Sequence, residues 1–240
     1  MIALSDGRAI LSFPTSKDYK RIGEGDRGPN TGGMGAHSPA GIFGATEFDG
    51  ILEHVLEKTI AAMREEGAEF RGVLYVGIML TDSGPKVLEF NVRLGDPEAQ
   101  PLVMRVENDL LPILMASARG NFEGRQLLSS KETSACVVLA SEGYPEKPVT
   151  GQVIMGLDRA ASCDGVQVFH AGTQQVDGQL VTAGGRVLNV CASGSSLRVA
   201  LDRAYAAADE ISWPGMVLRR DIGQRVLRLS AEQSQNGSAV

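Results

Sequence analysis

The 240-residue sequence predicts an α+β fold. Hairpin patterns and helical patterns both occur in it, but they do not alternate in the strict order that indicates a doubly wound sheet. Near residue 128 the pattern changes from longer segments to short strands separated by glycine turns. These observations predict a first domain over residues 1–128, a smaller and mostly β domain over 129–228, and a disordered tail over 229–240.

The first predicted elements are a hairpin and a loop. Residues 2–13 contain two apolar runs around an Asp-Gly pair, which is typical of a hairpin turn. Residues 14–41 are rich in glycine and proline and predict a long loop. Loops of this length inside a compact domain are commonly functional or disordered.

The next predicted element is an amphipathic helix. Thr46 and Asp49 form a capping-box pattern that predicts its start, and Gly67 predicts its end. The apolar residues between them recur at helical spacing. They predict one buried face made of Phe48, Ile51, Leu52, Val55, Leu56 and Ile60.

A second hairpin and a second helix complete the first domain. The hairpin is predicted over residues 71–92, around the turn "TDSG". Asp96 followed by Pro97 predicts an N-cap with proline at the first helical position, and the helix is expected to run to about Gly120. In the second domain we expect one helix over about 195–210 and strands over 133–141, 150–157, 165–173 and 178–192.

Composition argues against several classes of function. A formal net charge of −6 offers no general basic surface for nucleic acid. No apolar run approaches the roughly 18 residues of a membrane span, and the first residues show no secretory signal pattern. The three cysteines are odd in number and widely spaced, which fits a reducing compartment. The sequence therefore predicts a cytoplasmic protein with no nucleic-acid or membrane partner.

The stretch "VLEFNVRLGDPEAQ", residues 87–100, places polar side chains in an apolar frame. Glu89 and Asn91 share one face of a strand, because side chains alternate with a period of two. A carboxylate beside an amide oxygen suits Mg²⁺, although the pattern alone favours a solvated sheet face. Arg93 offers a planar donor fork for phosphate or carboxylate. Asp96 has either a functional role or the capping role given above.

A second candidate segment lies in the long loop. Lys17, Lys20 and Arg21 come shortly before "GPNTGGMGA", residues 28–36, whose glycines allow backbone N–H groups to approach an anion. The alternative is a mobile surface loop. The segment contains neither a Walker A pattern nor a strand-anchored GxGxxG pattern.

Two residues of the second domain have a functional and a structural interpretation. His170 stands on a predicted strand, and Arg186 follows a glycine pair. For both we favour the structural interpretation, with His170 hydrogen-bonded and Arg186 in a structural ion pair.

"GPNTGGMGA" (28–36) and "LEFNVRLGDPEAQ" (88–100) strongly resemble the phosphoribosylamine–glycine ligase family, also called glycinamide ribonucleotide synthetase. The segment "RLGDPEAQ" is the most specific part of this resemblance. Further segments extend it through the second domain to about residue 228: "SEGYP" (141–145), "VFHAGT" (168–173), "GGRVL" (184–188) and "RRDIG" (219–223).

The resemblance implies a fold and a reaction. The fold would be the C-terminal half of an ATP-grasp domain followed by a small, mostly β C-terminal domain. The reaction would join glycine to 5-phosphoribosylamine at the expense of ATP, by way of a glycyl phosphate, in purine biosynthesis.

The resemblance also assigns roles to individual residues. It implies that Glu89 and Asn91 hold the Mg²⁺ or Mn²⁺ at the ATP phosphates, so that Glu89 also belongs to the ATP site. Lys20 and Arg21 are candidates for phosphate contacts. Arg93 and Asp96 are the catalytic candidates, Arg93 for stabilising charge at the acyl phosphate and Asp96 for orienting it or the loop.

The family's chain is nearly twice as long as this sequence. We therefore expect an incomplete chain, without the N-terminal domain and the first half of the ATP-grasp unit, which a separate N-terminal half would complete. The alternative is a non-catalytic fragment or relic that folds and binds a partner through exposed apolar surface and an edge strand near residues 2–13. A different ATP-grasp carboxylate–amine ligase is a third possibility, and "RLGDPEAQ" argues against it.

Overall fold

The computed structural model describes residues 1–42 and 44–236, without the side chains of 45–47 and 233–236. These residues form two compact units, and each is considered by itself. The first unit contains residues 1–15, 40–95 and 106–130, and the second contains 16–39, 96–105 and 131–240. The chain crosses from the first unit to the second for the last time between residues 130 and 131, near the domain boundary expected at residue 128. That domain boundary stays a prediction.

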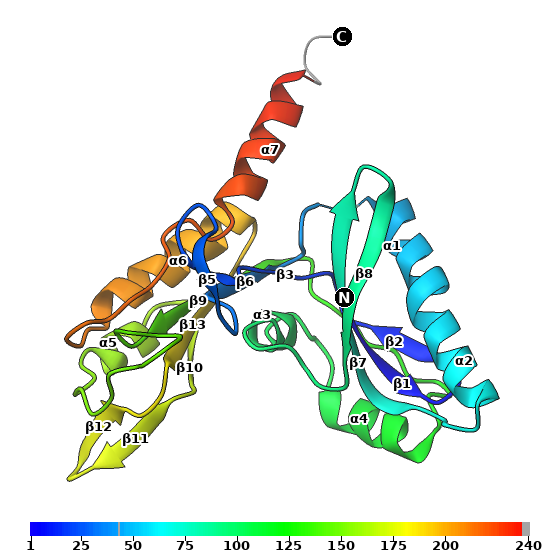
Figure 1. Cartoon of the computed structure of the whole chain (residues 1–240), viewed down its shortest axis with the longest axis horizontal. Coiled ribbons are helices and arrows are strands. Elements are labelled where there is room, and N and C mark those ends of the chain that lie inside the picture. Colours follow the sequence, from blue (N-terminus) through cyan, green and yellow to red (C-terminus); the bar gives the residue numbers. More distant parts are fainter. Residues whose placement is uncertain (43, 237–240) are drawn as a thin grey trace. The chain divides into compact units, whose positions relative to one another are not determined.

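The first unit is built on a four-stranded antiparallel sheet with the order β2-β1-β7-β8 (Figure 1). Both predicted hairpins are confirmed. β1 (Ile2–Asp6) pairs with β2 (Ile10–Ser12), and β7 (Arg71–Thr81) pairs with β8 (Gly84–Asn91). β1 also pairs with β7 and is buried, so β2 and β8 are the two edge strands.

One helical segment covers a face of this sheet. It consists of α1 (Ala45–Ile51), a π-helical stretch η1 (Leu52–Glu57) and α2 (Lys58–Glu65). Gly44 is the N-cap residue, and the capping box predicted at Thr46 rests on a side chain outside the described residues. The predicted face is confirmed, because Ile51, Leu56 and Ile60 are buried in a core that also contains Ala3, Leu74 and Val76 from the sheet.

The single helix predicted from Asp96 to Gly120 is wrong. The structure has α3 (Ala99–Val103) in the second unit and α4 (Leu110–Arg119) in the first unit. The chain between them is held out of a helix, because Val106 bridges to Ser129 and the Asn108 side chain bonds to the backbone of residues 126 and 128. The N-cap of α4 is Asp109, which accepts a hydrogen bond from the Leu111 N–H, and the predicted end at Gly120 is confirmed by its left-handed conformation.

The second unit is built on a five-stranded sheet with the order β10-β13-β9-β6-β3. These strands are β10 (Val166–His170), β13 (Arg186–Gly194), β9 (Thr133–Ala140), β6 (Gly35–Ser38) and β3 (Lys17–Asp18). The predicted helix is confirmed as α6 (Leu197–Glu210), which packs its alanine-rich face on the strand residues Val137, Leu139, Val190 and Ala192. Met104, the C-cap residue of α3, packs on Cys136, Val138 and Cys191 from alternate positions of the same strands.

Several smaller elements differ from the prediction. The loop expected over 14–41 contains strands β3 and β6 and the small hairpin of β4 (Arg21–Gly23) and β5 (Arg27–Asn30). No strand forms over 150–157, where Val153 and Met155 make only isolated bridges. β11 (Thr173–Val176) and β12 (Gln179–Thr182) form a separate hairpin, and α5 spans Leu157–Ala161. α7 (Gln224–Asn236) occupies most of the segment expected to be a tail, and residues 237–240 lie outside the described chain.

Within residues 1–42 and 44–236, no helix combines the length and the apolar character needed to cross a membrane.

A buried polar pair ties three segments of the second unit together. His37 on β6 is fully buried, and its Nδ1 donates to the carbonyl oxygen of Pro39 at 2.9 Å. Its Nε2 therefore accepts a hydrogen bond from the Tyr19 hydroxyl at 3.2 Å, while that hydroxyl oxygen accepts one from the N–H of Gly223 at 2.9 Å. Burial lowers the pKa of His37 to about 4, so the imidazole is neutral in the folded protein at neutral pH.

This burial predicts a loss of stability in mild acid. The unfolded chain binds a proton at His37 below its ordinary pKa of 6.5, whereas the folded chain does so only near pH 4. Stability should therefore fall as the pH drops from 6.5 to 4, by about 3 kcal/mol from this group. The test is urea unfolding followed by the fluorescence of Trp213, the sole tryptophan, in the parent and in His37→Asn. Equal pH slopes in the two proteins would contradict the assignment.

Candidate active site

Glu89 and Asn91 lie on the last part of edge strand β8. Glu89 stands opposite Gly77 and Asn91 stands opposite Tyr75 on β7. Residues directly opposite each other in an antiparallel pair project to the same face. Val76, between Gly77 and Tyr75, belongs to the core under the helices, so Glu89 and Asn91 project from the other face of the sheet. The predicted shared face is therefore supported by the register.

Gly77 gives the Glu89 side chain its space. A Cβ atom at position 77 would lie 3.0 Å from Cγ of Glu89, which is tighter than ordinary contact. A glycine inside a strand weakens the strand, so its presence here fits a close approach by a neighbouring side chain. The carboxylate of Glu89 consequently lies across the backbone of β7 and is exposed.

The strand carries a β-bulge next to Glu89. Val87 pairs with Ile78 and Glu89 pairs with Gly77, so Leu88 is an additional residue without a partner on β7. Strict alternation from the sequence would have placed Val87 on the face of Glu89. The bulge instead places Val87 on the face of Ile78, which packs against the helical core.

Arg93 lies beyond the end of β8, in the same unit as Glu89 and Asn91. Its Nη1 donates to the carbonyl oxygen of Leu94 at 3.0 Å, and the side chain is otherwise exposed. The structure thus leaves most of its donor fork open to a ligand.

The first unit offers a small set of oxygen ligands for a metal ion. Among the described residues, no group of three or more His, Cys, Asp or Glu side chains is arranged to hold a metal. Glu89 and Asn91 supply one carboxylate and one amide oxygen on an open face. This pair fits Mg²⁺, which commonly takes one or two protein ligands and fills its octahedron with water and phosphate oxygens.

Lys20 and Arg21 belong to the second unit, at the base of the glycine-rich segment 28–36. The Lys20 ammonium lies 2.6 Å from a carboxylate oxygen of Asp18, and its side chain is 45% exposed. The Arg21 guanidinium donates to the carbonyl oxygen of Gly28 at 2.7 Å. Thr31 donates from both its N–H and its hydroxyl to the Lys20 carbonyl oxygen, which fastens the two segments together.

Asp96 also lies in the second unit, where it binds Arg186. Nη2 of Arg186 is 3.0 Å from Oδ2 of Asp96, and Nη1 donates to the Asp96 carbonyl oxygen at 2.6 Å. The structural ion pair predicted for Arg186 is confirmed, and the capping role considered for Asp96 is wrong because its carboxylate is taken up by this pair. His170 is hydrogen-bonded to the Thr173 hydroxyl as expected, although it is exposed.

Several of the segments that carry the family resemblance meet around Arg186 in the second unit. The guanidinium also contacts the Gly33 carbonyl oxygen at 3.4 Å, and the N–H of Gly32 donates to the Tyr144 hydroxyl at 2.9 Å. A Cβ at Gly32 would lie 2.7 Å from Cζ of Arg186, and one at Gly33 would collide with Pro97. The two glycines are therefore required by close packing inside the protein.

Arg219, which was not selected from the sequence, holds the β4–β5 hairpin in place. Arg219 is 1% exposed, and its guanidinium binds Asp221 at 2.8 Å and Asp26 at 3.0 Å. It also donates to the Arg21 carbonyl oxygen at 3.0 Å. Burial alone would lower the pKa of Arg219, but its hydrogen bonds to Asp221 and Asp26 raise it. The segment "RRDIG" contained part of the signal, since it holds both Arg219 and its partner Asp221.

Comparison with solved structures defines the class of fold. Phosphoribosylamine–glycine ligase from Thermotoga maritima superposes with a TM-score of 0.82 at 36% identity, over 92% of this chain and 54% of that one. N5-carboxyaminoimidazole ribonucleotide synthetase from the same organism superposes with a TM-score of 0.55 at 15% identity, over 88% and 50%. The fold is thus an α+β fold of the ATP-grasp class, as the resemblance implied.

Sequence comparison narrows the class to one family. Residues 1–99 match the phosphoribosylglycinamide synthetase ATP-grasp (A) domain, and residues 134–225 match the C domain of the same synthetase. The chain belongs to the phosphoribosylglycinamide synthetase family. It is 49% identical over 220 residues to phosphoribosylamine–glycine ligase of Mesorhizobium japonicum, covering 92% of this chain and 52% of that protein. It is 46% identical over 230 residues to the chloroplastic enzyme of Arabidopsis thaliana, covering 94% and 43%. The chain therefore spans about half the length of the curated relatives it matches.

The Arg186 cluster predicts a specific sensitivity to arginine geometry. Arg186→Lys keeps the charge but removes the fork that reaches two oxygens of Asp96, so the second unit should lose about 1–2 kcal/mol of stability. Arg198→Lys, at an exposed position on α6, is the matched control and should lose little. Urea unfolding monitored at Trp213 measures both. Equal midpoints for the two variants would contradict a structural role for Arg186.

Proposed function

We propose that this chain carries the metal and phosphate ligands of an ATP-dependent ligase that joins glycine to 5-phosphoribosylamine. The products are glycinamide ribonucleotide, ADP and phosphate. One observation carries the proposal: the Glu89–Asn91 pair projects from an open face of β8 in a chain nearly half identical to proteins named for this reaction.

The reaction has two steps. The glycine carboxylate attacks the γ-phosphorus of ATP, and ADP leaves as glycyl phosphate forms. The amine of phosphoribosylamine then attacks the carbonyl carbon, phosphate leaves, and the nitrogen loses a proton as the amide forms. A protein accelerates such transfers mainly by positioning the reactants and neutralising charge.

The residues of the first unit would serve the phosphoryl transfer. Glu89 and Asn91 would hold Mg²⁺ or Mn²⁺, which when bound neutralises charge on the ATP phosphates. The exposed fork of Arg93 would stabilise the charge that develops on the transferred phosphoryl group.

The residues of the second unit would serve mainly to order the glycine-rich segment. Asp96 is held by Arg186 beside Gly33, which supports a role in positioning residues 28–36 over direct contact with the acyl phosphate. Lys20 keeps an exposed ammonium and remains a candidate for a phosphate contact. Arg21 is a weaker candidate, because its guanidinium already donates to Gly28.

A cytoplasmic location and small-molecule substrates form part of the proposal. The acidic net charge and the three free cysteines support it, as expected from the sequence.

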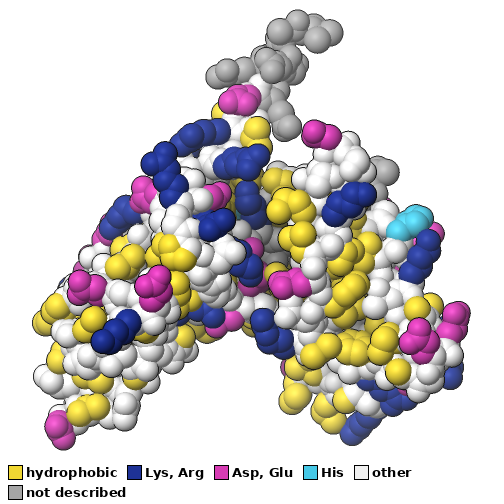
Figure 2. Space-filling model, viewed as in Figure 1, with side chains coloured by type: hydrophobic (Ala, Val, Ile, Leu, Met, Phe, Trp, Pro, Cys, Tyr) yellow, Lys and Arg dark blue, Asp and Glu magenta, His cyan; other side chains and the backbone are white. Residues whose placement is uncertain are grey.

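A second candidate function is binding to a complementary chain without catalysis. Edge strand β8, its neighbour β7 and the residue that follows β8 expose apolar side chains, namely Met79, Leu80, Val87, Leu88, Phe90 and Val92. Hydrophobic side chains gather over this hairpin in Figure 2. An exposed edge with apolar neighbours favours association with another polypeptide. The complementary half of the family fold is the partner that we propose in either case.

An assay of ADP release separates the two functions. The chain would be supplied with ATP, Mg²⁺, glycine and freshly made phosphoribosylamine, alone and with the co-expressed N-terminal half of the Mesorhizobium relative. We expect turnover only in the presence of the added half. A stable complex without turnover would support the binding function instead.

Glu89→Gln should lower turnover of the complemented enzyme at least a hundredfold, because a charged ligand of the metal is lost. Its apparent requirement for Mg²⁺ should also rise. Glu57→Gln, at an exposed position on η1, is the matched control and should behave like the parent. Parental turnover of Glu89→Gln at limiting Mg²⁺ would sink the metal assignment.

Substitutions of Arg93 and Asp96 should have different effects on turnover and on melting temperature. Arg93→Gln should lower turnover tenfold or more with unchanged melting, because its side chain supports little of the fold. Asp96→Asn should lower the melting temperature, because Arg186 loses its charged partner. Thermal melting and turnover measured on both variants decide this. An unchanged melting temperature for Asp96→Asn, with strongly reduced turnover, would restore a direct role in catalysis.

A further inference from the structure

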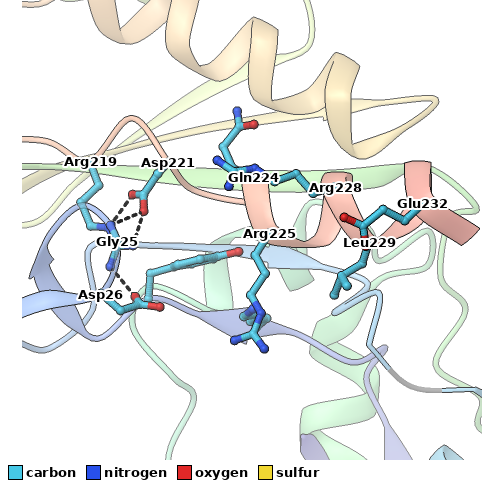
Figure 3. Close-up of a pocket in the computed structure, with 11 residues that line it drawn as sticks. Gly25, Asp26, Arg219, Asp221, Gln224, Arg225, Arg228, Leu229 and Glu232 are labelled. Atoms are coloured by element: carbon cyan, nitrogen blue, oxygen red, sulfur yellow. Dashed lines mark hydrogen bonds and ion pairs between the residues drawn. The ribbon is translucent and has the colours of Figure 1, made fainter.

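A cavity of about 410 Å³ opens in the second unit beside the start of α7 (Figure 3). Four cationic side chains line it, namely Lys17, Arg219, Arg225 and Arg228. Arg225 and Arg228 stand three positions apart on α7 and so share one side of the helix. The volume lies within the range of small-molecule sites.

Two of the three carboxylates in the cavity pair with a single cation, Arg219. Asp26, Asp221 and Glu232 line the cavity, but Asp26 and Asp221 are both bound to Arg219 (Figure 3). In the part of the chain that the structure describes, neither Arg225 nor Arg228 has a carboxylate within ion-pair distance. Three cations therefore face the cavity with Glu232 as the one remaining acidic group among the residues that line it.

Lys17 lies close to two of the other cations, Arg219 and Arg225. The Lys17 ammonium lies 5.2 Å from the centroid of the Tyr19 ring, and the Arg219 guanidinium lies 5.2 Å from the same centroid. Burial lowers the pKa of Lys17, and the positive charge of Arg225 lowers it further. Charges of one sign held this close together favour the binding of an anion.

We propose that this cavity binds the phosphate group of the ribosyl substrate, an assignment that rests on the proposed function. Of the substrates in that reaction, phosphoribosylamine alone carries a phosphomonoester, a dianion matched to Lys17, Arg225 and Arg228. ATP would bring a metal ion, and the aspartates of the cavity that could ligate one are engaged by Arg219. The planar forks of two arginines suit the tetrahedral oxygens of a phosphate.

Binding of ribose 5-phosphate to this chain tests the proposal without ATP, metal or turnover. Isothermal titration should show binding of ribose 5-phosphate and no binding of ribose, with a weaker response to inorganic phosphate. Arg225→Gln and, separately, Arg228→Gln should each weaken the binding of ribose 5-phosphate about tenfold or more. Arg198→Gln, at an exposed position on α6, is the matched control and should bind like the parent. Trp213 fluorescence melting checks that each variant is folded.

The outcomes separate this proposal from the ligase function. Binding of ribose 5-phosphate that depends on Arg225 supports the cavity even if the complemented enzyme shows no ligase activity. No saturable binding by the folded parent, or equal binding by the parent and both cavity variants, overturns the cavity assignment and leaves the ligase proposal standing. Displacement of ribose 5-phosphate by metal-free ATP, with ATP binding equally dependent on Arg225, would identify a nucleotide site and also overturn it.

Discussion

The buried guanidinium of Arg219 is the interaction on which the second unit depends around its candidate site. It binds residues 21 and 26 of the β4–β5 hairpin, almost 200 positions earlier in the chain, and its near neighbour Asp221. A guanidinium removed from water is tolerated only when it is paired and hydrogen-bonded, and here both conditions are met. Because Arg219 pairs with Asp26 and Asp221, these two carboxylates do not neutralise the other cations of the neighbouring cavity.

Local signals were sufficient for the two hairpins and the first helical segment of the first unit, and for the end of α4. The Asp-Gly turn, the helical spacing of Ile51, Leu56 and Ile60, and the left-handed Gly120 each act through neighbours in sequence, so the sequence pattern alone could predict them. The continuous helix after Asp96 failed for the opposite reason. Asp96 binds Arg186, 90 positions away, and Asn108 binds residues 126 and 128. Such partners cannot be read from local propensity.

The functional residues likewise include some that local sequence patterns could predict and some that they could not. Glu89 and Asn91 could be grouped from the period of a strand, because both follow the bulge and keep the regular alternation. The cavity beside α7 could not be found by that means. Its cations come from positions 17, 219, 225 and 228, which meet only through the antiparallel sheet and the Arg219 network. The clustering of arginines in residues 219–228 was visible in the sequence. The sequence did not show that Lys17, about 200 positions earlier, lies beside them.

The bulge at Leu88 has a consequence for how this hairpin can evolve. Glu89 and Asn91 are registered against Gly77 and Tyr75 on the inner side of the bulge, while the turn at residues 82 and 83 lies on its outer side. A strand slip of one residue normally turns every side chain to the opposite face. Here a gain or loss of one residue near the hairpin tip can be absorbed where Leu88 already has no partner. The outer hairpin can therefore accept a change of one residue in its length while the two candidate oxygen ligands keep their orientation.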